Sequence, residues 1–240
     1  MFLEKVADWK PTRDDLNQYL ADNDFPSFDA MKFDHLQGQE RSKLEKSVTC
    51  VRDYSENVKE KAGMSLILVA SDKPDDINRT GFGCGKTTLA KIVFYSQCTF
   101  SYSQGIPDSL HHIVPGKFYD GRSLMAEFDK PNFDQSYFLR SFRRMLVIDD
   151  LGREGNLKWE KRDPEIQAQE KRDRYYTIIN YCYENNVSLV ITSNMTSRQL
   201  ADFLGGASWS RLLKMCPSDY RINMTGIMDY RPLLADTSWF

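Results

Sequence analysis

A glycine-rich loop and an apolar strand that ends in two carboxylates constrain this chain more than any other feature. The loop, residues 80–88, has the sequence Thr-Gly-Phe-Gly-Cys-Gly-Lys-Thr-Thr and follows the apolar run at 64–70. The strand, residues 146–150, has the sequence Leu-Val-Ile-Asp-Asp. Glycines let backbone N–H groups approach phosphate oxygens, and a helix that starts at the loop adds the positive end of its dipole. Together the two segments predict a site for a nucleoside triphosphate and magnesium.

The residue types in these segments indicate separate roles. Lys86 can reach the β- and γ-phosphates, and the hydroxyl of Thr87 can bind the metal. Asp149 stands where a strand end delivers a carboxylate toward that metal, and Asp150 can orient or deprotonate the attacking water. The other loop residues that we expect to contact the nucleotide are Gly81, Gly83, Cys84, Gly85 and Thr88.

The loop departs from the strict phosphate-binding pattern at its entrance. The pattern places glycine five residues before Gly85, where this chain has Thr80. Residues 71–80 also separate the preceding strand from the loop. Surface insertions of this length change stability little, so the simpler interpretation is a solvated loop. The alternative is an insertion that alters the geometry of the site and the rate of turnover.

Three further polar residues are candidates for the same chemistry, each with a structural alternative. Asn194 ends a second apolar strand and can reach the γ-phosphate or the water, or it can cap the following helix. Arg211 follows a Gly-Gly pair on a short predicted helix and could be donated to the phosphate of a neighbouring subunit. Arg231 offers another arginine near the chain end. A surface ion pair is the alternative for both arginines.

Composition excludes several classes of protein. A net charge of −2 provides no global attraction to nucleic acid, so any such contact must come from a local patch or from assembly. The five cysteines include no Cys-x-x-Cys pair, which argues against a zinc site and a disulfide framework. The N-terminus does not resemble a signal peptide, and no apolar run is long enough to span a membrane. We therefore expect a cytoplasmic protein without a membrane partner.

Helices and buried strands alternate in the predicted pattern, which is typical of a parallel α/β sheet with helices on both faces. Strands are expected at 64–70, 145–149, 187–192 and 220–224, and Thr12 is expected to cap a short first helix with Asp15 as its partner. Between residues 97 and 131 the pattern predicts only a helix at 120–128.

The chain resembles the AAA+ ATPases that load the bacterial replicative helicase, the DnaC/DnaI type, and the IstB-like transposition helpers are close to them. The resemblance covers about residues 33–231. It rests on Phe-Asp-His-Leu at 33–36, Gly-Cys-Gly-Lys-Thr-Thr-Leu-Ala at 83–90, Leu-Val-Ile-Asp-Asp-Leu-Gly at 146–152, Ile-Thr-Ser-Asn at 191–194, Trp-Ser-Arg-Leu-Leu at 209–213 and Gly-Ile-Met-Asp-Tyr-Arg at 226–231.

The resemblance implies a P-loop NTPase fold with a five-stranded parallel sheet and a reduced lid. It implies that residues 33–240 form the ATPase domain and that residues 1–32 are a short extension. Lys86 and Thr87 would be the Walker A pair, and Asp149 and Asp150 would form Walker B. Asn194 would be sensor 1, Arg211 an arginine finger acting in trans, and Arg231 sensor 2.

The resemblance also implies partners and two competing functions. The first is an ATP-dependent helicase loader or remodeller in replication initiation, which assembles as a homo-oligomer with ATP and Mg²⁺ and engages single-stranded DNA and the replicative helicase. The second is an IstB-like helper of a transposase, a nucleotide-switched scaffold on DNA. Loaders carry a separate module that grips the helicase, whereas about thirty residues precede the core here, so the expected helicase contact comes from the resemblance alone.

Overall fold

The core of the molecule is a five-stranded parallel sheet. The computed structural model describes residues 12–22, 27, 37–71, 83–103, 116–153 and 163–227. The strands pair in the order β2-β3-β4-β1-β5, and every pairing is parallel. The predicted parallel α/β sheet is therefore confirmed. The strands are β1 (Leu66–Val69), β2 (Gly116–Asp120), β3 (Met145–Leu151), β4 (Ser188–Ser193) and β5 (Arg221–Asn223).

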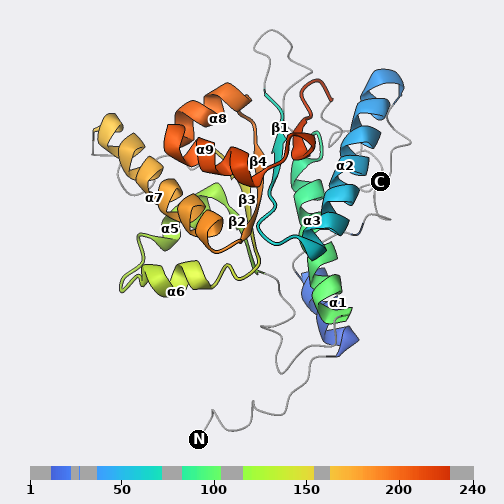
Figure 1. Ribbon diagram of the computed structural model, residues 1–240, viewed down its shortest axis with the longest axis horizontal. Helices are drawn as coiled ribbons and strands as arrows, with labels where there is room; N and C mark the ends of the chain where they lie inside the picture. The colour runs from blue at the N-terminus through green and yellow to red at the C-terminus, as the bar shows by residue number, and fades with distance from the viewer. Residues whose placement is uncertain are drawn as a thin grey trace, which may run out of the picture.

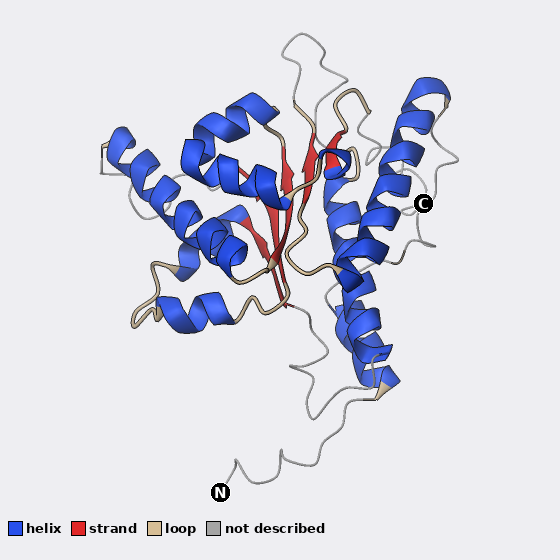
Figure 2. Cartoon of the chain, viewed as in Figure 1, coloured by secondary structure: helices blue, strands red, loops and turns tan. Residues whose placement is uncertain are grey.

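Helices cover both faces of this sheet, as Figure 1 and Figure 2 show. One layer contains α1 (Arg13–Asp22), α2 (Gly38–Glu60) and α3 (Lys86–Ser103). The opposite layer contains α5 (Gly121–Glu127), α6 (Gln135–Arg140), α7 (Pro164–Glu184), α8 (Ser197–Leu204) and α9 (Gly206–Met215). A short 3₁₀ turn, η2 (Ser218–Tyr220), leads into β5. Because both faces are covered, the central strands β1, β3 and β4 are almost entirely buried, which explains their continuous apolar sequences.

Strand β2 was not expected from the sequence pattern. It lies at the edge of the sheet and pairs only with β3. Most of its residues are partly or largely exposed, so it lacks a continuous apolar signature. Gly116 starts it, and a Cβ atom at this position would lie 1.6 Å from the carbonyl oxygen of Met145. The strand can therefore begin here only because residue 116 has no side chain.

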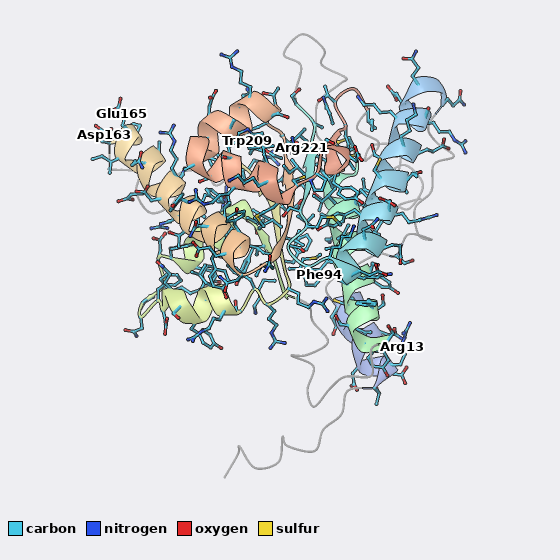
Figure 3. All side chains as sticks on the ribbon, viewed as in Figure 1. Arg13, Phe94, Asp163, Glu165, Trp209 and Arg221 are labelled. Carbon is cyan, nitrogen blue, oxygen red and sulfur yellow. The ribbon has the colours of Figure 1, made fainter. Side chains whose placement is uncertain are left out.

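The helix caps follow the sequence signals. The expected cap of α1 is confirmed, because the Asp15 amide donates to the Thr12 hydroxyl and the Thr12 amide donates back to the Asp15 carboxylate. Asp163 caps α7 by accepting from the amide of Glu165, and both residues lie at the outer end of that helix in Figure 3. These caps satisfy N–H groups that have no partner within the helix.

Helix α1 packs against α3. Leu16 and Leu20 are buried in the main core, and Arg13 lies over the ring of Tyr102 at 5.7 Å (Figure 3). The predicted boundary at residue 33 falls outside the described residues, as do residues 228–240. Within the part of the chain that the structure describes, no helix has both the length and the apolarity to cross a membrane.

Candidate functional site

Three neighbouring strand ends bring the predicted site residues together. Strand β4 lies between β1 and β3, so the segments that follow these strands meet at the carboxyl edge of the sheet. Lys86 begins α3 after β1, Asp149 and Asp150 lie near the end of β3, and Asn194 follows β4. Parallel α/β sheets bind ligands at this edge.

The glycine loop has a backbone shape that only glycine adopts easily. Gly83 and Gly85 have φ values of 66° and 93°. The Gly85 carbonyl accepts the Leu89 amide at 2.9 Å, so α3 starts directly at the end of the loop. The first amides of α3 are therefore available to an anion, and Thr88 lies in this first turn. Gly81 lies outside the described residues.

Cys84 is packed inside the loop rather than presented to solvent. Its side chain is 1% exposed, and Lys86 Nζ donates to its Sγ at 3.5 Å. Because the thiol is buried, a contact of Cys84 with the nucleotide would come from its backbone, and that contact stays a prediction. The small thiol instead fills space under the loop, which agrees with the alternative of a small residue in a tight turn.

Lys86 and Asn194 are directly linked. Lys86 is only 5% exposed, and its Nζ donates to Asn194 Oδ1 at 2.8 Å. The Asn194 amide in turn donates to Asp150 Oδ1 at 3.3 Å. Asn194 therefore bridges the lysine of one strand end and a carboxylate of another. The alternative role of Asn194 as a helix cap is wrong, because Thr196 caps α8 with a full capping box.

Asp149 receives two hydroxyl groups. The Thr87 hydroxyl donates to the carboxylate, and its Oγ1 lies 2.9 Å from Oδ1 and 3.0 Å from Oδ2. The Thr192 hydroxyl donates to Oδ1 at 2.6 Å. The side chain is 8% exposed. Burial raises the pKa of Asp149, and the charge of Asp150 acts in the same direction, against the two hydroxyl hydrogen bonds and Lys86. The charged form of the Asp149 carboxyl is therefore poorly solvated by the protein alone.

We predict that Asp149→Asn stabilises the ligand-free protein at neutral pH. A carboxyl whose pKa is raised by folding destabilises the native state once the pH exceeds its unfolded value, and asparagine removes that charge. Both hydroxyls already reach Oδ1, so the amide oxygen can keep both hydrogen bonds. Thermal melts should show a higher Tm, by about 2–4 °C for each kcal/mol released. The gain should shrink toward pH 3, where the parent carboxyl is protonated, and a lower Tm at pH 7 would contradict this view of Asp149.

Asp150 has an unusual backbone. Its φ is 51°, and the pairing of β3 with β4 shifts between Ile148 and Leu151. The residue therefore lies in a bulge at the end of the strand, and this turns its side chain toward Asn194. Arg153 also contacts it at 3.3 Å, but both side chains are partly exposed, so this pair contributes little to stability.

Arg211 is not part of this cluster. It lies on α9, where its guanidinium stacks over the ring of Tyr176 at 4.9 Å and donates to the Tyr176 hydroxyl and the Ala207 carbonyl. Tyr176 belongs to α7 and is 39% exposed. No carboxylate pairs with Arg211 among the described residues, so the predicted surface ion pair is replaced by an aromatic contact. Arg231 lies outside the described residues.

Comparison with known proteins identifies the fold. No protein-family model and no curated protein matches the sequence. The crystal structure of the DnaC helicase loader has 24% sequence identity, covers 79% of this chain and 95% of that chain, and superposes with a TM-score of 0.50. The crystal structure of DnaI has 17% identity, covers 85% of this chain and 89% of that chain, and has a TM-score of 0.53. The chain has the fold of the DnaC helicase loader and of DnaI.

Two residues that contact predicted site residues were not singled out by the sequence analysis. Thr192 contacts Asp149, and Tyr176 supports Arg211. A polar residue within the apolar run of β4 is a signal for Thr192, since a buried hydroxyl needs a partner. Tyr176 had no such signal, because α7 and α9 are separate in the sequence.

Proposed function

We propose that this AAA+ chain binds and hydrolyses ATP at the carboxyl edge of its sheet. The observation that carries the proposal is the meeting of Lys86, Thr87, Asp149, Asp150 and Asn194 at three adjacent strand ends. Lys86 would exchange its contact with Asn194 for phosphate oxygens. The first amides of α3 would hold the same phosphates through the helix N-terminus.

The residues present fit a magnesium ion. Thr87 and Asp149 offer oxygen atoms, the ligand type that Mg²⁺ prefers, and their mutual hydrogen bond places both at one point. Among the described residues, no three His, Cys, Asp or Glu side chains could hold a metal together. The other ligands would therefore be phosphate oxygens and water. When bound, Mg²⁺ would neutralise charge on the β- and γ-phosphates.

Asp150 and Asn194 are assigned to the attacking water. Asp150 does not share the hydroxyl contacts of Asp149, and its carboxylate is directed toward Asn194 instead. A carboxylate in that position can accept a proton from water, while the amide of Asn194 can orient the water or the γ-phosphate. The two adjacent acids thus have different tasks because the bulge separates their side chains.

Replacing Asp150 with asparagine tests this function. Asparagine tolerates a positive φ, so the bulge should persist. We expect ATP affinity within a few-fold of the parent and turnover lower by about 10²-fold or more, the usual effect of losing a positioned base. Binding is measured by calorimetry and turnover by phosphate release. Asp149→Asn is the matched control and should weaken metal-dependent binding itself. Equal losses of affinity and turnover in Asp150→Asn would make Asp150 a second metal ligand.

We further propose that the chain acts in DNA replication as a cytoplasmic helicase loader that assembles into a homo-oligomer with ATP. The support is its fold, shared with the DnaC helicase loader over nearly the whole of that chain. Arg211 would serve the site of the neighbouring subunit, since it lies apart from the cluster of its own chain. Single-stranded DNA and a replicative helicase are the expected partners.

Co-purification separates the two functions that the sequence leaves open. A loader should co-elute with the replicative helicase hexamer from its own host in the presence of ATP and Mg²⁺. An IstB-like transposition helper should instead form ATP-dependent filaments on duplex DNA, visible by electron microscopy. Lys86→Ala is the control in both experiments, because it should lose either assembly if nucleotide drives it. Filaments without helicase binding would overturn the loader assignment.

A further inference from the structure

Strand β3 contains one more residue than β4 at the point where the two carboxylates lie. Ile148 pairs with Ile191, but the next paired residues are Leu151 and Ser193. Asp149 and Asp150 thus face Thr192, and Asp150 adopts a φ of 51°. The regular ladder of backbone hydrogen bonds is interrupted here, so other groups must satisfy the backbone of the bulge.

Two hydroxyls of β4 replace the missing ladder. Thr192 Oγ1 accepts the amide of Asp150 at 2.9 Å, and Ser193 Oγ donates to the Leu151 carbonyl at 2.6 Å. The two hydroxyls differ in their second contact. Thr192 donates its proton to Asp149 Oδ1 at 2.6 Å, whereas Ser193 accepts the amide of Met195 at 3.1 Å. Of these two hydroxyls, only that of Thr192 connects the backbone of the bulge to a carboxylate.

We propose that Thr192 is the positioning residue that gives the two acids their separate tasks. Its side chain is fully buried, and one hydroxyl both orients Asp149 toward Thr87 and fixes the peptide that turns Asp150 toward Asn194. A hydroxyl can donate once and accept as well, so the same group satisfies both carboxylate and amide. This inference rests on the proposed ATPase function. It makes Thr192 the residue that couples the expected metal ligand Asp149 to the expected base Asp150.

Four variants separate positioning from simple packing. Thr192→Val keeps the shape and removes the hydroxyl, and Thr192→Ser keeps the hydroxyl. Thr192→Cys keeps a side chain of similar size and replaces the hydroxyl with a thiol, which is a weak donor. It replaces Thr192→Val in the test if the valine variant does not fold. Ser193→Ala is the matched control, because it also loses a hydroxyl of the bulge but one without a carboxylate contact. Thermal melts establish that each variant is folded.

The first measurement is the affinity for Mn²⁺ of the complex between the protein and a non-hydrolysable ATP analogue. Electron paramagnetic resonance detects the bound Mn²⁺. Thr192→Val should weaken Mn²⁺ binding by about 10–100-fold, the usual effect of losing a partner of a metal ligand. Affinity for the analogue without metal should stay within about twofold, since Lys86 and α3 are unchanged. Thr192→Ser and Ser193→Ala should bind Mn²⁺ like the parent. Equal Mn²⁺ affinity in Thr192→Val and parent, or equal losses in Thr192→Val and Ser193→Ala, would overturn the proposal.

The second measurement needs no nucleotide. Amide hydrogen exchange of Asp150 in the ligand-free protein should be faster in Thr192→Val than in the parent, and Thr192→Ser should restore it. Unchanged exchange in Thr192→Val would contradict the role of Thr192 in holding the bulge. A parent that binds no ATP analogue would instead contradict the proposed function, and with it the role toward metal, so the two failures are distinguishable.

Discussion

Replacing Arg211 with alanine should slow ATP hydrolysis by about 10³-fold or more while leaving ATP binding unchanged. An arginine brought to the transferring phosphoryl group by a neighbouring subunit neutralises developing charge and increases the rate by about 10³–10⁵. Within its own chain Arg211 contacts only Tyr176 and Ala207 among the hydrogen bonds and ring contacts described, so its loss should not disturb Lys86 or Asp149. The rate of phosphate release, measured across a series of protein concentrations, checks the expectation.

Mixing of variants tests whether the arginine acts in trans. Arg211→Ala retains an intact nucleotide site, and Lys86→Ala retains an intact arginine, so a mixture should recover part of the parent rate. Tyr176→Phe is the control for packing, because it keeps the ring under the guanidinium and removes the hydrogen bond. A parent rate per subunit that does not change on dilution, together with no recovery on mixing, would assign Arg211 a purely structural role on α7 and α9.

Replacing Lys86 with alanine should remove nucleotide binding altogether. Lys86 is the buried cation of the cluster, and its Nζ lies between Asn194 and the loop residue Cys84. Without it, the phosphates would face Asp149 and Asp150 with less compensating charge. The substitution should not unfold the protein, since Asn194 keeps Asp150 as a partner and α3 keeps its start at Gly85. A thermal melt of the ligand-free variant provides that control, and loss of the folding transition would make the binding result uninformative about the phosphates.

Much of the site could be predicted because its chemistry lies in short segments. The loop at 83–88 and the pair at 149–150 each combine a local backbone shape with the residues that use it, so spacing along the chain was sufficient. Asn194 required the strand order, since its alternative as a helix cap is equally compatible with the sequence. The order β3-β4-β1 resolves the choice by placing Asn194 between Lys86 and Asp150.

Features that depend on contacts between distant segments were not predictable. The role of Thr192 arises from a one-residue bulge in the opposite strand, and nothing in Leu-Val-Ile-Asp-Asp indicates where the register shifts. The partner of Arg211 is an aromatic ring on another helix rather than the carboxylate of a surface ion pair. Strand β2 has no apolar pattern because it is an edge strand, although Gly116 marks its close approach to β3.

Calorimetric titration with a non-hydrolysable ATP analogue and Mg²⁺ tests the central claim most directly, because it asks only whether this edge of the sheet is a triphosphate site. The parent should bind one analogue per chain, with weaker binding when Mg²⁺ is chelated, and Lys86→Ala should give no saturable heat under the same conditions. Binding to Lys86→Ala as tight as to the parent, or no binding to the folded parent, would contradict the account.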